Sequence, residues 1–117
     1  MKIRLRFPDA TFTVVLIDQV ATRALVAQLP LRLKVSDFAS AEKIAYLPER
    51  LSTQGAPGGS DARPGDLCYY APWGNLAFFY RAGAYAAGLV HLGRVEGPID
   101  ALARQGDGLV TIERADD

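Results

Sequence analysis

Two side chains have the reactivity that catalysis or metal binding commonly uses, and each occurs once. His91 is the only histidine and Cys68 the only cysteine among the 117 residues. Protein zinc sites take three or four ligands from His, Cys and carboxylates, and a single His without a cluster does not supply them. A Ser–His–Asp hydrolase commonly carries its nucleophile in a G-x-S-x-G turn, which does not occur here. We therefore predict no metal or cofactor and no catalytic residue. We expect a structural role for His91, with acid–base work as the alternative.

Cys68 lies in an apolar stretch without a second cysteine or a neighbouring base, which predicts a buried and unreactive thiol. A lone cysteine also excludes an internal disulfide and is typical of a reducing compartment. The sequence Gly58-Gly59-Ser60-Asp61 has the composition of a phosphate cradle but lacks the P-loop lysine and a following helix. We predict that it belongs to a mobile loop over 52–65, although a loop of this length also occurs at functional sites.

The charges of the chain give no sign of a nucleic-acid partner. Thirteen basic and thirteen acidic side chains cancel. The one basic cluster, Lys2, Arg4 and Arg6, is predicted to be the solvated face of a strand, with a phosphate-binding ridge as the alternative. Acidic residues at the other end, Glu113, Asp116 and Asp117, would lie beside it if the first and last strands pair. No apolar run approaches the ~20 residues that span a bilayer, and the N-terminus lacks the apolar core of a signal peptide. We expect a soluble cytoplasmic protein without a membrane or nucleic-acid partner.

The most apolar and aromatic stretch is GDLCYYAPWGNLAFFYR, residues 65–81, which must supply the main packing surface. Seven of the eleven aromatic residues fall between Tyr69 and Tyr85. The alternation predicts two strands joined by a turn at 71–74, with Pro at its second position. Both faces of these strands are apolar, which is typical of central strands that are covered on both sides.

The rest of the chain reads as alternating strands with two helices. A first helix follows Asp18 as its N-cap and ends at Pro30, and a second opens at Gly97-Pro98. We predict a single domain over 1–117. Eight strands and two short helices predict a mainly β protein, a closed eight-stranded barrel capped by the two helices. A two-layer sandwich is the rival architecture. The remaining strands are expected at 2–7, 11–17, 31–36, 42–47, 89–96 and 109–114.

Several segments in this order resemble the cyclophilin-like fold, and more specifically the small bacterial and archaeal cyclophilin-like proteins, most of which are uncharacterised. The segments are QLPLRLKVSDF, EKIAYLPERL, GDLCYY, NLAFFYR and LGRVEGPIDAL, so the resemblance spans nearly the whole chain. It implies a closed barrel with a binding groove on an outer face, beside the third to sixth strands.

The likeness to true cyclophilins is confined to two short matches. LGRVEG is similar to the stretch before their last helix, and Phe78-Phe79 is similar to their paired phenylalanines. Their catalytic arginine, in a phenylalanine-histidine-arginine segment, has no match in 31–35, and Ala77 replaces the glutamine before the phenylalanine pair. The resemblance therefore implies prolyl isomerisation only as an alternative function.

We predict a binding role for a small ligand or an extended, proline-containing peptide in an aromatic-lined surface groove. The alternative is weak peptidyl-prolyl cis–trans isomerase activity, and a third class is a homodimer contact through 83–88 and the aromatic hairpin. The candidate binding residues are the aromatic side chains of the predicted groove, the basic residues beside it and the lone histidine: Arg32, Lys34, Tyr46, Tyr70, Trp73, Phe79, Arg81, Tyr85, His91 and Arg94.

Overall fold

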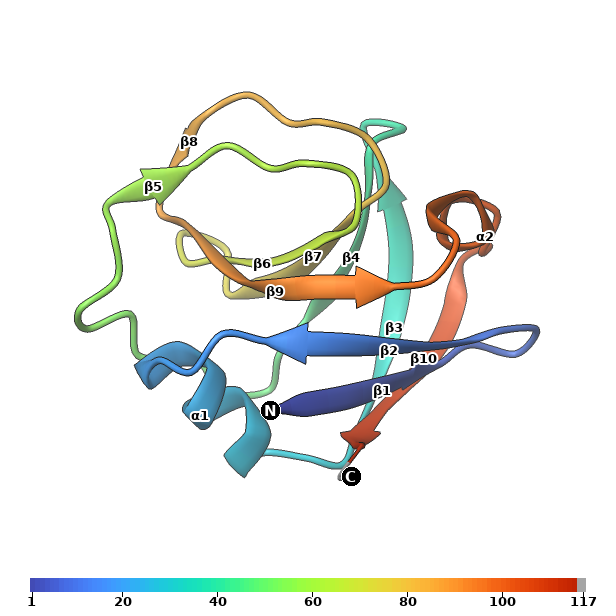
Figure 1. Cartoon of the computed structure of the whole chain (residues 1–117), viewed down its shortest axis with the longest axis horizontal. Coiled ribbons are helices and arrows are strands. Elements are labelled where there is room, and N and C mark those ends of the chain that lie inside the picture. The colour runs from blue at the N-terminus through green and yellow to red at the C-terminus, as the bar shows by residue number, and fades with distance from the viewer. Residues whose placement is uncertain (116–117) are drawn as a thin grey trace.

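The computed structural model describes residues 1–115, and its strands form a closed β-barrel (Figure 1). The barrel strands are β1 (Lys2–Arg6), β2 (Thr11–Leu16), β3 (Leu31–Phe38), β4 (Glu42–Tyr46), β6 (Asp66–Tyr70), β7 (Asn75–Phe79), β9 (Leu89–Glu96) and β10 (Gly108–Arg114). All neighbours are antiparallel, in the order β1-β10-β3-β4-β7-β6-β9-β2. This confirms the predicted eight-stranded barrel and excludes the two-layer sandwich.

Side chains with period two fill the interior of the barrel. On β6 and β7 the inward residues are Leu67, Tyr69, Leu76 and Phe78, all fully buried in the main core cluster. Their neighbours in sequence point outward, as the alternation predicts. The hydroxyl of Tyr69 accepts a hydrogen bond from the backbone N–H of Leu51 at 3.1 Å, so its polar end is satisfied inside the core.

Two short helices, α1 (Val20–Ala27) and α2 (Ile99–Ala103), lie on opposite sides of the molecule in Figure 1. Leu25 and Leu102 are fully buried and join the same core cluster from the two helices. Within residues 1–115, neither helix has the length and apolar character needed to cross a bilayer.

The start of α1 differs by one residue from the prediction. Gln19, not Asp18, occupies the N-cap position. The backbone N–H of Gln19 donates to the hydroxyl of Thr22 at 3.0 Å. The carboxylate of Asp18 instead accepts a hydrogen bond from Arg23 at 2.7 Å, and this ion pair draws it away from the helix terminus.

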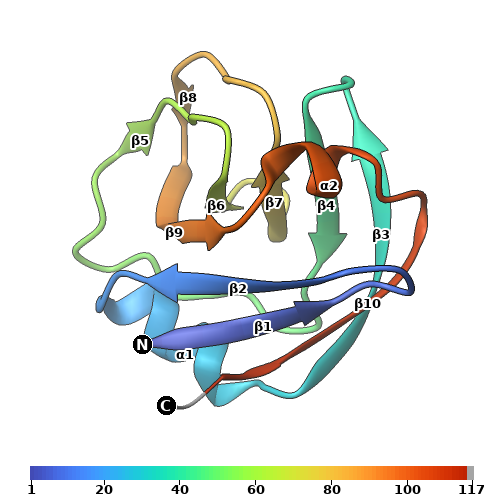
Figure 2. The ribbon, with the colours of Figure 1, turned by 45° about the vertical axis from the view of Figure 1, so that its right-hand side comes forward.

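A second layer covers the outer face of the central hairpin. The long loop contains a short strand, β5 (Gly59–Ser60), which pairs with β8 (Ala86–Ala87) outside the barrel (Figure 2). This short strand within the predicted loop over 52–65 was not expected from the sequence. Under this layer lies a second buried cluster, which explains why both faces of the hairpin are apolar: Ile44, Ala62, Cys68, Ala77, Phe79 and Leu89.

The basic face of β1 lies beside acidic residues, because β1 pairs with both β2 and β10. Arg4 stands opposite Glu113 in the register, and the side chain of Arg6 forms an ion pair with Glu113. Both partners of this pair are partly exposed, as expected for a solvated face. The prediction that Asp116 and Asp117 also approach this face concerns positions outside the described residues.

Candidate functional site

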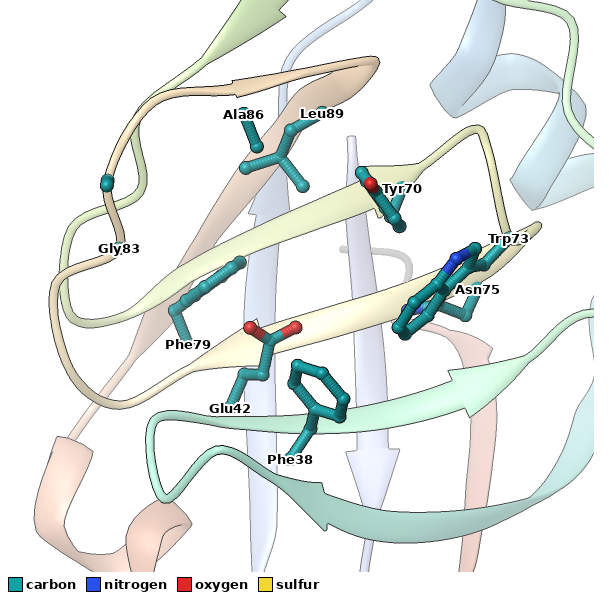
Figure 3. Close-up of a pocket in the computed structure, with 10 residues that line it drawn as sticks. Phe38, Glu42, Tyr70, Trp73, Asn75, Phe79, Gly83, Ala86 and Leu89 are labelled. Carbon is teal, nitrogen blue, oxygen red and sulfur yellow. The ribbon is translucent and has the colours of Figure 1, made fainter.

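A cavity of about 360 Å³ opens on the outer face of the barrel, between strands β3, β4, β6 and β7 and the segment that carries β8. We call it the aromatic cavity, because four aromatic rings line it (Figure 3). Its ten lining residues are Phe38, Glu42, Tyr70, Trp73, Asn75, Phe79, Gly83, Ala84, Ala86 and Leu89.

Strand pairing aligns three of these side chains across one face of the sheet. In the register, Glu42 of β4 stands opposite Phe38 of β3 and also opposite Phe79 of β7. Directly opposed residues of antiparallel strands have neighbouring side chains on the same face. The carboxylate of Glu42 consequently lies between two phenyl rings, as Figure 3 shows.

The turn between β6 and β7 places Trp73 at the rim of the aromatic cavity. The carbonyl of Tyr70 accepts hydrogen bonds from the N–H groups of Trp73 at 3.2 Å and Gly74 at 2.9 Å. Gly74 has φ +73°, a conformation that glycine adopts without strain. The indole contacts Phe38 and Tyr70 edge to face, with ring centroids 5.5 Å and 5.3 Å apart. Trp73 and Phe38 remain 45% and 41% exposed, so the rim presents two large apolar rings to solvent.

Small residues of the second layer form the opposite wall. Two backbone hydrogen bonds fix Gly88, at the end of this wall, to the neighbouring segments. Its N–H donates to the Gly58 carbonyl at 2.8 Å, and its carbonyl accepts the N–H of Ala71 at 2.9 Å. Gly88 has φ +82°, and a Cβ there would lie 2.8 Å from Cδ of Pro72. The layer and the Trp73 turn therefore pack at a distance that only glycine allows.

The aromatic cavity has few polar side chains, and Glu42 is the charged one among its lining residues. Burial raises the pKa of Glu42 above its usual value, and the nearby negative charge of Asp37 raises it further. Asn75 is 1% exposed, and its Nδ2 donates to the carbonyl of Leu76 at 3.0 Å. Its Oδ1 has no hydrogen-bond partner among the described residues. None of the ten lining residues is Lys, Arg or His.

Three of the ten residues singled out from the sequence line the aromatic cavity: Tyr70, Trp73 and Phe79. Five others are exposed and lie outside its lining, namely Arg32, Lys34, Tyr46, Arg81 and Tyr85. The sequence reasoning did not single out Phe38, Glu42 or Asn75. The period-two pattern contained a signal for the first two. Phe38 follows Arg32, Lys34 and Ser36 on the outward face of its strand, and Glu42 lies on the same strand face as Ile44.

The remaining two, His91 and Arg94, lie together on another part of the outer face. Nη1 of Arg94 is 2.6 Å from Oδ1 of the buried Asp66, and Nε2 of His91 is 3.4 Å from the same oxygen. The other carboxylate oxygen accepts the backbone N–H of Arg63 at 2.9 Å. This network joins β6, β9 and the preceding loop, which agrees with a structural role for His91.

Within residues 1–115, the histidine and the cysteine form neither a cluster of metal ligands nor a reactive thiol site. Among residues 1–115, no three His, Cys or carboxylate side chains are grouped as metal ligands. Cys68 is fully buried under the second layer. Burial, together with the charges of Asp66 and Glu42, raises the pKa of its thiol to about 12, so the thiol stays protonated and unreactive at neutral pH.

The comparisons with known proteins identify the family of the chain. No curated protein matches the sequence. A family model described as the Cyclophilin-like family matches residues 5–113, from within β1 to within β10. The chain therefore belongs to the Cyclophilin-like family.

Proposed function

We propose that this protein binds an organic ligand, a small molecule or an extended peptide segment, in the aromatic cavity. One observation carries the proposal: two large rings, Trp73 and Phe38, stay exposed at the rim of a cavity of about 360 Å³. This volume falls within the usual range of ligand pockets, which are mostly apolar with a few polar groups. The lining has the same character, with Glu42 and Asn75 as polar groups among aromatic and small apolar residues.

Covering the exposed rings supplies a driving force for binding. The exposed part of the Trp73 side chain is roughly 100 Å² on the scale of a tryptophan. Removing that area from water contributes about 2.5 kcal/mol at ~25 cal/mol per Å². Phe38 adds a comparable area, because it is exposed to nearly the same fraction. The rim thus favours ligands with a flat or extended apolar part.

Weak prolyl isomerase activity is the second candidate function, and it is favoured by the position of Phe79 in the lining of the aromatic cavity. This residue, the second of the phenylalanine pair, lines the aromatic cavity, where it can contact a proline ring. Catalysis also needs a hydrogen-bond donor that stabilises the twisted amide. The donors in the lining are neutral, such as the Tyr70 hydroxyl and the Trp73 indole, and the charged group is the carboxylate of Glu42. Ligand binding is therefore the stronger proposal.

A thermal-shift screen of metabolites and proline-containing peptides tests the binding proposal. Trp73 is the only tryptophan, so its fluorescence reports on the rim directly. We expect compounds that raise the melting temperature to change the Trp73 emission as well. Stabilising compounds that leave this emission unchanged would place the binding site elsewhere and contradict the proposal. For the isomerase candidate, exchange NMR on a proline peptide is decisive, and unaccelerated cis–trans exchange at stoichiometric protein removes it.

A further inference from the structure

Glu42 is the one charged side chain among the residues that line the aromatic cavity. Its cross-strand neighbours on both sides are phenylalanines, Phe38 and Phe79. Within residues 1–115, no hydrogen bond or ion pair engages its carboxylate, and burial raises its pKa. An ionised carboxylate that is partly removed from water is unfavourable unless a cation or donors compensate it.

The adjacent cation cannot supply this compensation. Lys43 follows Glu42 on β4, and strand alternation turns it to the opposite face of the sheet. There it is 4% exposed and its Nζ lies 3.1 Å from Oδ1 of Asp37 and 5.2 Å from the ring centroid of Tyr80. The chain therefore compensates Lys43 internally and leaves Glu42 facing the aromatic cavity without a counter-charge.

The other lining groups also favour a positive charge. The face of an aromatic ring carries the negative side of its quadrupole and attracts cations. The Trp73 ring stands at 85° to Phe38 and 78° to Tyr70, so the aromatic rings that line the cavity differ in orientation. The Oδ1 of Asn75 is buried in the cavity wall and has no hydrogen-bond partner within residues 1–115. The cavity therefore combines one uncompensated carboxylate with aromatic rings, whose faces can contact a cation.

We infer that the ligand carries a protonated amine, whose N–H groups pair with the carboxylate of Glu42 while the aromatic rings cover the attached hydrocarbon. This inference rests on the proposed function and names its ligand class. A single carboxylate is too few ligands for a metal ion, so an organic cation is the chemistry that fits. A neutral ligand would leave the carboxylate unpaired, and an anion would be repelled by it.

Three probes of similar size and different charge test the inference: benzylammonium, benzyl alcohol and benzoate. Each is titrated at pH 7 against Trp73 emission. We expect benzylammonium to bind about tenfold or more tightly than benzyl alcohol, since hydrogen bonds between charged partners are the stronger kind, and benzoate to bind most weakly. Equal affinities for the alcohol and the ammonium would overturn the inference, while the proposed function would stand because the probes still bind.

Two variants of Glu42 distinguish an effect of its charge on binding from an effect on folding. Glu42→Gln keeps the shape of the side chain and should abolish the preference for benzylammonium while retaining the affinity for benzyl alcohol. Glu42→Asp keeps the charge with a shorter reach and should retain part of the preference. Glu49→Gln, at an exposed position outside the aromatic cavity, is the matched control and should bind like the unmodified protein. A preference that survives in Glu42→Gln would overturn the inference.

The same titration distinguishes two sources of the amine. N-acetyl-lysine-N-methylamide presents a lysine side chain in a peptide-like form. Tighter binding of this compound than of benzylammonium would support a peptide side chain, and the reverse order would support a small-molecule amine. Absence of binding by both amines would overturn the inference, and the ligand screen described above would then decide the proposed function separately.

Discussion

The indole of Trp73 meets the ring of Phe38 edge to face, with centroids 5.5 Å apart and planes at 85°. The two residues come from distant parts of the chain, the turn after β6 and the end of β3. Their contact closes one side of the aromatic cavity, and it forms because β4 and β7 bring β3 beside the turn. The rim of the cavity is therefore built by the closed barrel itself.

Replacement of Trp73 by alanine should weaken binding of the ligands found by screening at least about tenfold, because a central aromatic contact is lost. The variant should remain folded, with unfolding free energy reduced by about 1–2 kcal/mol through the lost ring contacts. Isothermal titration calorimetry and urea unfolding measure the two effects. Tyr46→Ala is the matched control, since Tyr46 is 55% exposed on the same barrel face and does not line the cavity. Equal losses of affinity in both variants would contradict the assignment of the site.

Glu42→Gln should stabilise the folded protein at pH 7. Burial raises the folded pKa of Glu42 above its usual value of 4.5. The unfavourable burial of the charged form is absent below pH 4.5. It sets in as the pH rises through the folded pKa, and it is complete above that pKa. Urea unfolding should show a gain of about 1 kcal/mol at pH 7 that disappears near pH 4. A variant that is less stable than the unmodified protein at pH 7 would show that the carboxylate has a stabilising partner.

Asp37→Asn should destabilise the fold at neutral pH, because it removes the charged partner of the buried Lys43. The hydroxyl of Tyr80, 2.5 Å from Oδ1, is the main cause that lowers the pKa of Asp37, and Lys43 lowers it further. The contribution of Asp37 to stability is therefore present above its usual value of 3.8 and is lost as the pH falls through the lower folded pKa. We expect a loss of roughly 1–3 kcal/mol at pH 7, measured by urea unfolding.

The control for this variant is Asp61→Asn, at an exposed carboxylate outside the Lys43 cluster, which should leave stability nearly unchanged. The difference between the two variants should shrink when unfolding is measured well below pH 3.8, where both carboxyl groups are protonated. A loss in Asp37→Asn that does not depend on pH would show that charge is not its cause.

Gly88→Ala should cost more stability than Gly97→Ala. Both glycines have positive φ, +82° and +105°, where an alanine costs about 1–2 kcal/mol. At Gly97 the added Cβ meets nothing within 4 Å, whereas at Gly88 it approaches Pro72 to 2.8 Å. We expect an additional loss of roughly 1 kcal/mol or more at Gly88 from this overpacking, seen in parallel urea titrations. Equal losses at the two positions would show that the second layer adapts to the methyl group.

Local alternation was enough to predict the barrel strands, because the period-two pattern records which side chains face the interior. Alternation predicts that Leu67 and Tyr69 share one face and Cys68 and Tyr70 the other, and the structure shows that the first pair points inward and the second outward. The same pattern places Phe79 on the opposite face of its strand from Phe78. The predicted N-cap of α1 was wrong by one residue. The carboxylate of Asp18 pairs with Arg23 instead of capping the helix, and a short stretch of sequence does not reveal this ion pair.

Alternation indicates that Glu42 faces outward, but its position between Phe38 and Phe79 could not be predicted, because that depends on strand register between distant segments. A polar residue at the start of a strand reads as solvated until β3 and β7 place Phe38 and Phe79 on either side of it. The pairing of β5 with β8 could not be predicted either, because a strand of two residues is too short to show a period-two pattern in the sequence. Tertiary pairing, not residue type, made this carboxylate a site residue.

An NMR titration of ¹⁵N-labelled protein with the tightest ligand from the screen tests directly whether the ligand binds in the aromatic cavity. Trp73 supplies the only indole N–H resonance, at the rim of the aromatic cavity. We expect this resonance to shift together with the backbone amides of Phe38, Glu42 and Phe79. Shifts that gather instead around His91 and Arg94, with the indole resonance unmoved, would contradict binding in the cavity.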